Sequence, residues 1–177
     1  MSTRLIIIIL TLLFFSNCDL ITDTVSDSRD RYDGEIIYFN SFESPKDTVG
    51  WTGYAGIRLY EEAAPEGGNY SLLVSGGCPI PHALYKIGPF QRNAGLVIEG
   101  WGRAKDAGGG VSLQTNFFSD EARKYTGFSI DAEDWKFFQS EEIMSVERGD
   151  VLYIHINAGG IVPGTVLIDR LTVRVVN

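Results

Sequence analysis

The sequence predicts an all-β domain, an antiparallel β-sandwich of the jelly-roll kind, behind an N-terminal export segment. Apolar and polar residues alternate with a period of two over many short segments, and no stretch keeps a helical spacing. Clusters rich in glycine separate these segments. Many short strands joined by such turns are typical of sandwiches and jelly rolls.

The N-terminus is typical of a bacterial lipoprotein signal. After the basic start Met1–Arg4, the apolar run Leu5–Phe15 would rise about 16 Å as a helix, which is too short to span a bilayer. Cys18 follows at once, so residues 1–17 resemble a signal that is cut before a lipidated cysteine. Asn17 departs from the small residue that such signals prefer. The alternative is an ordinary secretory signal in which Cys18 has no role.

We therefore expect an exported lipoprotein, anchored through Cys18 to the cell envelope, at the outer membrane or the cell surface. Residues 18–34 are polar and charged, which predicts a flexible tether. Residues 35–177 have the size of one domain. The net charge of −8 argues against a nucleic-acid partner. A lipidated Cys18 leaves Cys78 without a disulfide partner.

Ten strands are expected in the domain, each bounded by turn residues. They are Glu35–Asn40, Gly56–Glu61, Tyr70–Ser75, His82–Ile87, Leu96–Arg103, Val111–Phe117, Tyr125–Ile130, Trp135–Ser140, Val151–Asn157 and Thr165–Val176.

Three of these strands, 96–103, 111–117 and 151–157, have one aliphatic side and one side that mixes aromatic and polar residues. The aliphatic sides are expected to face the core. Sugar rings stack on aromatic faces and pair their hydroxyls with polar groups, so the other sides predict a carbohydrate site. Its candidate residues are Glu99, Trp101, Arg103, Gln114, Asn116, Tyr153 and His155. The alternative is that a loop such as Phe117–Ala122 covers Trp101 and the polar residues are only solvated.

Six segments, taken in their order along the chain, carry a resemblance to known proteins. They are YFNSFE at 38–43, GW at 50–51, GGNYSLLV at 67–74, VIEGWGRA at 97–104, DWK at 134–136 and VLIDRLTV at 166–173. The ordered set resembles the carbohydrate-binding modules of families 4, 9 and 22, within the galactose-binding-domain-like jelly rolls. The resemblance implies that fold and a glycan ligand on the concave sheet.

The resemblance also implies a structural calcium ion between the first and last strands. The matching carboxylates are Glu43 and Asp169, and backbone carbonyls near Ser41 and Asn69 would complete the shell. Calcium prefers six to eight such oxygen ligands. The chain departs from the family at Arg170, where a second acid is common. An ion pair of Arg170 with Glu43 or Asp169 could replace the metal, and both alternatives stay open here.

We expect no enzyme activity. Tyr153, His155 and Arg103 could serve a polysaccharide lyase, but the signature motifs of lyases, glycosidases, esterases and zinc enzymes are absent. The leading hypothesis is a non-catalytic, membrane-anchored lipoprotein that binds an oligo- or polysaccharide. The rival is a structural or protein-interaction β-sandwich of the envelope that binds no sugar and contacts envelope proteins.

Overall fold

The computed structural model describes residues 33–53, 55–76, 82–115, 117–118, 123–159 and 162–176, with the backbone alone at 82. The expected signal, Cys18, most of the tether, Cys78 and Asn116 lie outside the described residues. The strands are β1 (Glu35–Asn40), β2 (Trp51–Gly53), β3 (Gly56–Tyr60), β4 (Ser71–Gly76), β5 (His82–Pro89), β6 (Ala94–Ala104), β7 (Gly109–Thr115), β8 (Tyr125–Ile130), β9 (Lys136–Gln139), β10 (Met144–Val146), β11 (Val151–Ala158) and β12 (Gly164–Val176), with a short 3-10 helix, η2 (Pro45–Thr48), after β1.

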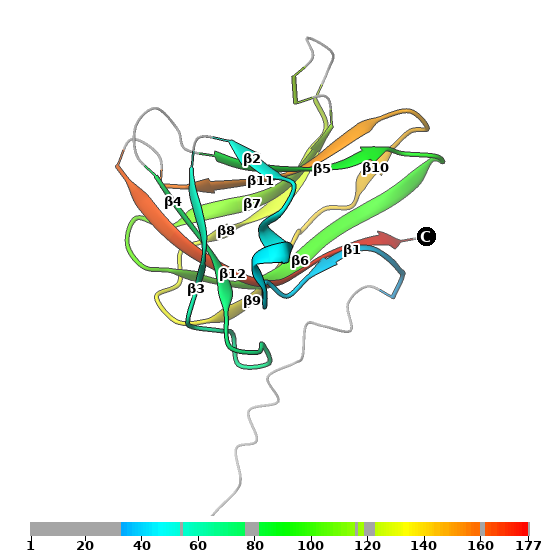
Figure 1. The fold of residues 1–177 in the computed structure, drawn as a ribbon. Helices are drawn as coiled ribbons and strands as arrows, with labels where there is room; N and C mark the ends of the chain where they lie inside the picture. Colours follow the sequence, from blue (N-terminus) through cyan, green and yellow to red (C-terminus); the bar gives the residue numbers. More distant parts are fainter. Residues whose placement is uncertain are drawn as a thin grey trace, which may run out of the picture. The chain divides into compact units, whose positions relative to one another are not determined.

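These strands form two antiparallel sheets (Figure 1). The large sheet has seven strands in the order β10-β6-β12-β4-β3, with β1 paired to β12 and β9 paired to β6. The small sheet has five strands in the order β2-β5-β11-β7-β8. The all-β sandwich that the sequence predicts is confirmed.

The core lies between the two sheets and is built from the aliphatic sides of their strands. In the large sheet Ile98 of β6 and Ile168 of β12 are fully buried, and in the small sheet Leu113 of β7 and Ile154 of β11 are fully buried. Their neighbours along each strand point away from the core, because successive side chains alternate between faces. The strands expected to have an aliphatic side therefore do bury it.

Two short strands escaped the sequence analysis. β2 and β10 have three residues each, which is too few to show an alternation. β12 also contains an irregularity, because its register against β6 shifts between Asp169 and Thr172, where Arg170 has a φ of 50°. Among the described residues no helix is long and apolar enough to cross a membrane.

Candidate functional site

The seven candidate carbohydrate residues do not form one site, because they lie on different sheets. Glu99, Trp101 and Arg103 belong to β6 of the large sheet, whereas Gln114 on β7 and Tyr153 and His155 on β11 belong to the small sheet. Asn116 is outside the described residues. Each set does point away from the core, but the two outer faces look in opposite directions. The expectation of one shared face is wrong.

On the large sheet, Glu99 and Arg103 are engaged in ion pairs. Glu99 is 3% exposed, and its carboxylate accepts hydrogen bonds from Arg174 Nε at 2.6 Å and Gln139 Nε2 at 3.2 Å. Arg103 pairs with Glu62, which also accepts a hydrogen bond from Trp135 Nε1 at 3.2 Å. These contacts give both residues a structural role.

Trp101 is half-buried on the outer face of the large sheet. Its ring meets Phe137 of β9 edge-on, with centroids 5.8 Å apart. In strand register it lies beside Asp169, a fully buried residue. The segment that precedes β4 covers this face, since Ala64 is 4% exposed and its N–H donates to Asp169 Oδ2 at 3.0 Å. Because β6 belongs to the large sheet and β7 and β11 to the small sheet, Trp101 lies on the opposite outer face from Gln114, Tyr153 and His155.

The small sheet presents its polar side chains in rows that run across the strands. Tyr153, Gln114 and Tyr125 form one row on β11, β7 and β8. His155 and Ser112 form the next row, followed by Asn157 and Gly110. Because residues in register on adjacent strands share a face, these rows form a continuous outer surface.

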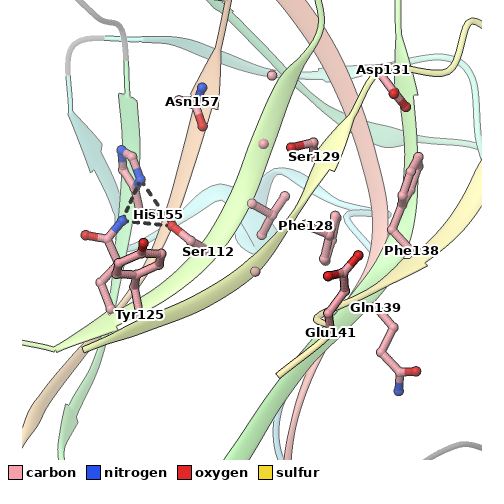
Figure 2. A pocket seen from close by; sticks show the side chains of 15 residues that line it. Ser112, Tyr125, Phe128, Ser129, Asp131, Phe138, Gln139, Glu141, His155 and Asn157 are labelled. Atoms are coloured by element: carbon pink, nitrogen blue, oxygen red, sulfur yellow. Dashed lines mark hydrogen bonds between the residues drawn. The ribbon is translucent and has the colours of Figure 1, made fainter. Parts of the chain in front are cut away.

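A groove of about 760 Å³ crosses this surface and reaches the edge of β9 (Figure 2). We call it the small-sheet groove. Its lining consists of Gly109, Gly110, Val111, Ser112, Gln114, Tyr125, Gly127, Phe128, Ser129, Asp131, Phe138, Gln139, Glu141, His155 and Asn157. The volume lies within the range of small-ligand sites.

The polar groups at the floor of the groove orient one another. Gln114 Nε2 donates to Ser112 Oγ at 2.8 Å and lies 3.1 Å from His155 Nδ1, which is also 3.4 Å from Ser112 Oγ. Asn157 Nδ2 donates to the carbonyl of Gly159 at 3.3 Å. The floor therefore offers fixed donors and acceptors rather than freely rotating ones.

Aromatic rings border the groove at several points. Tyr125 is 74% exposed on the edge strand β8, and Phe128 stacks on Phe138 with centroids 5.6 Å apart. Phe117 lies against His155 with centroids 5.3 Å apart, and Phe118 meets Tyr153 edge-on at 5.4 Å. The segment at 117–118 thus lies against Tyr153 of the small sheet, and it does not cover Trp101 in the way that the alternative interpretation of the sequence expects.

The sequence analysis found Gln114 and His155 but missed the wall of the groove on β8 and beyond. Tyr125, Ser129, Asp131, Gln139 and Glu141 all line it. The alternation of Tyr125, Gly127 and Ser129 was a usable signal, because it gives β8 a polar side that matches β7. Glu141 follows β9, and no local pattern links it to the groove.

The expected calcium ligands gather around one turn. Glu43 Oε2 accepts the N–H of Asn69 at 2.9 Å, and the Asp169 carboxylate accepts those of Ala64 and Arg170 at 3.0 and 2.7 Å. A side chain at Gly67 would collide with Asp169 at 2.1 Å, and one at Gly68 would collide with Glu43 at 2.3 Å. The two carboxylates therefore flank the same two glycines.

Arg170 does not form the ion pair considered as a substitute for the metal. Its guanidinium donates to the carbonyl of Glu66 at 2.5 Å and lies over the ring of Phe39. Burial raises the pKa of Asp169, whereas the N–H donors of Ala64 and Arg170 lower it, and the charges of Glu43 and Arg170 act in opposite directions to a smaller extent. Both carboxylates accept backbone N–H groups, with Glu43 accepting those of Gly68, Asn69 and Tyr70, so a cation between them would have to share these oxygens. The described residues hold no group of three or more His, Cys, Asp or Glu side chains placed for a metal, so carbonyls such as that of Ser41 would have to contribute.

Comparisons with known proteins bear on the fold. No family model matches the sequence, and no curated protein matches it. Among solved structures, the CBM22-1 xylan-binding domain of Xyn10C from Paenibacillus barcinonensis is similar, with a TM-score of 0.62 and 19% identity over 82% of this chain and 97% of that one.

Two further structures are similar over most of the chain. The CBM22-1-GH10 modules of Xyn10B from Clostridium thermocellum, complexed with xylohexaose, have a TM-score of 0.58 and 12% identity over 79% of this chain and 28% of that one. A family 11 module from the same organism, in complex with a β-1,3-1,4-mixed-linked tetrasaccharide, has a TM-score of 0.51 and 12% identity over 76% and 92%. The chain thus has the jelly-roll fold that these carbohydrate-binding modules share.

Proposed function

We propose that this protein binds a carbohydrate chain in the small-sheet groove, as a non-catalytic, lipid-anchored module of the bacterial envelope. The observation that supports it most is the lining of the groove. Tyr125 offers an exposed aromatic face, and Gln114 and His155 offer oriented hydrogen-bonding groups beside it. Sugars need this mixture, since their rings have apolar faces and polar edges.

The fold adds support of a general kind. Jelly-roll sandwiches serve many functions, so the likeness to carbohydrate-binding modules agrees with sugar binding but does not identify a ligand. The proposal therefore rests on the residues that line the groove. The groove combines aromatic rings, amides, hydroxyls and an imidazole within one lining.

The structure does not bring together the three residues that the lyase alternative requires. Arg103, which would neutralise a uronate, lies on the large sheet and pairs with Glu62, whereas Tyr153 and His155 lie on the small sheet. A binding role needs no such set. Incubating the protein with uronate polymers and following the absorbance of unsaturated products should show no turnover above a blank.

The anchor and the ion belong to the same proposal. Lipidation at Cys18 would hold the groove near the cell surface, within reach of a glycan that partner proteins use. A calcium ion held by Glu43 and Asp169 would join the end of β1, the Gly67–Gly68 turn and the bulge of β12. It would stabilise the fold and take no part in sugar contact.

Calorimetric titration with xylohexaose, cellohexaose and a mixed-linked glucan tetrasaccharide tests the binding. We expect one of these probes to bind the wild-type protein and to lose about tenfold in affinity in Tyr125→Ala, because a tenfold loss is about 1.4 kcal/mol and a lost aromatic contact costs an energy of this order. Tyr60→Ala is the matched control, since Tyr60 lies on the large sheet beside Lys105. Equal losses in both variants, or no binding of any probe, would contradict the proposal.

A further inference from the structure

The charged side chains that line the small-sheet groove, among the described residues, are all acidic. Of the side chains that line it, Asp131 and Glu141 are acidic, and none of the lining residues that the structure describes is a lysine or an arginine. Figure 2 shows both acids on the Phe138 side of the groove, across from His155 and Asn157. A ligand in the groove therefore meets negative charge along one wall.

Three cations of the neighbourhood are engaged or lie outside the lining, and a fourth, Lys136, lies on β9 two residues from Phe138 without lining the groove. Lys124 pairs with Glu147 and Asp150, and the Arg123 guanidinium lies over the ring of Phe117. Lys86 shares a row with Tyr153, but Tyr153 stands between it and Gln114. None of these groups offsets the acidic wall from inside the groove.

We propose that the small-sheet groove selects uncharged glycans and rejects chains that carry uronates, with Asp131 and Glu141 as the residues that determine this specificity. The inference rests on the proposed function, since it specifies the ligand class of the same site. A uronate carboxylate bound along this wall would lie near two like charges in a partly desolvated groove, where electrostatic repulsion is stronger than in bulk water. The acidic net charge of the chain acts in the same direction at longer range.

The test compares xylohexaose with a xylohexaose that carries one glucuronate branch, by calorimetric titration of the wild-type protein. We expect the branched probe to bind about tenfold more weakly at low salt, and the gap to narrow as salt screens the exposed acids. In Asp131→Asn/Glu141→Gln the ratio of the two affinities should approach one, whatever the change in the absolute affinity for xylohexaose.

A matched control removes two charges elsewhere. Glu35→Gln/Glu61→Gln changes the net charge by the same amount, at β1 and just after β3, and should keep the gap. Equal binding of both probes by the wild type, or a gap that the control also closes, would overturn the inference and leave sugar binding intact. If the branched probe binds and xylohexaose does not, the inference is also overturned. Failure of the neutral probes and the branched probe alike would instead refute the proposed function.

Discussion

Replacing Glu99 by alanine separates a structural role from a ligand-binding one. The side chain of Glu99 is 5% exposed and that of its partner Arg174 is 24% exposed, so the pair is largely shielded from water. Removing one member of such a pair strands the other, which typically costs 3–5 kcal/mol. Because Arg174 can still reach water in part, we expect the low end, about 3 kcal/mol. For a domain of this size that lowers Tm by about 10 °C.

Scanning calorimetry measures this directly, with Glu35→Ala as the matched control. Glu35 also pairs with an arginine, Arg92, but both side chains are about 60% exposed, and such pairs contribute little. The control should therefore melt within about a degree of the wild type. Glu99→Ala should keep full sugar affinity at a temperature where it is folded. An unchanged Tm together with lost binding would refute the structural role and show that Glu99 contacts the sugar.

Three further results are expected. Adding calcium to chelator-treated protein should raise Tm by several degrees, because a ligand bound only to the folded state stabilises it, and the rise should be absent in Glu43→Gln; no rise in the wild type would exclude the ion. Ile154→Ala, at a fully buried core position, should lower the free energy of unfolding in urea by about 3 kcal/mol; a loss below about 1 kcal/mol would contradict the packing described here. Cys18→Ser should move the protein from the membrane fraction to the soluble fraction of cells that export it, and unchanged fractionation would contradict lipidation.

The fold was largely predictable because its signal is local. Alternation along strands such as Val151–Ala158 reports which side is buried, and glycine-rich turns report where a strand ends. β2 and β10 were missed because three residues carry no period. The faces were also assigned correctly, since Ile98, Leu113 and Ile154 all point into the core.

The site was only half predictable, because alternation does not say which sheet a strand joins. β6 and β7 are consecutive in the sequence and both have a polar side, yet they belong to opposite sheets. Glu99 and Gln114 therefore look alike in the sequence and lie on opposite faces of the sandwich. The pairing that divides them, β6 with β12 and β7 with β11, is set by contacts between distant segments.

The turn around Glu43 shows the converse case. Glu43 and Asp169 are far apart in the chain, and no local pattern predicts that their carboxylates lie close together. Only the resemblance to a known family predicts this. The structure places both against Gly67 and Gly68, where no side chain could fit. A pattern that spans the whole domain thus carried more information about this turn than any local period.

The account depends most on where the ligand sits, and amide chemical-shift mapping during titration with xylohexaose reports this directly. We predict the largest shifts at Ser112, Gln114, Gly127 and His155, on β7, β8 and β11 of the small sheet, with Glu99 and Trp101 of the large sheet unmoved. Shifts concentrated at Trp101 and its neighbours on β6 and β9 would contradict it.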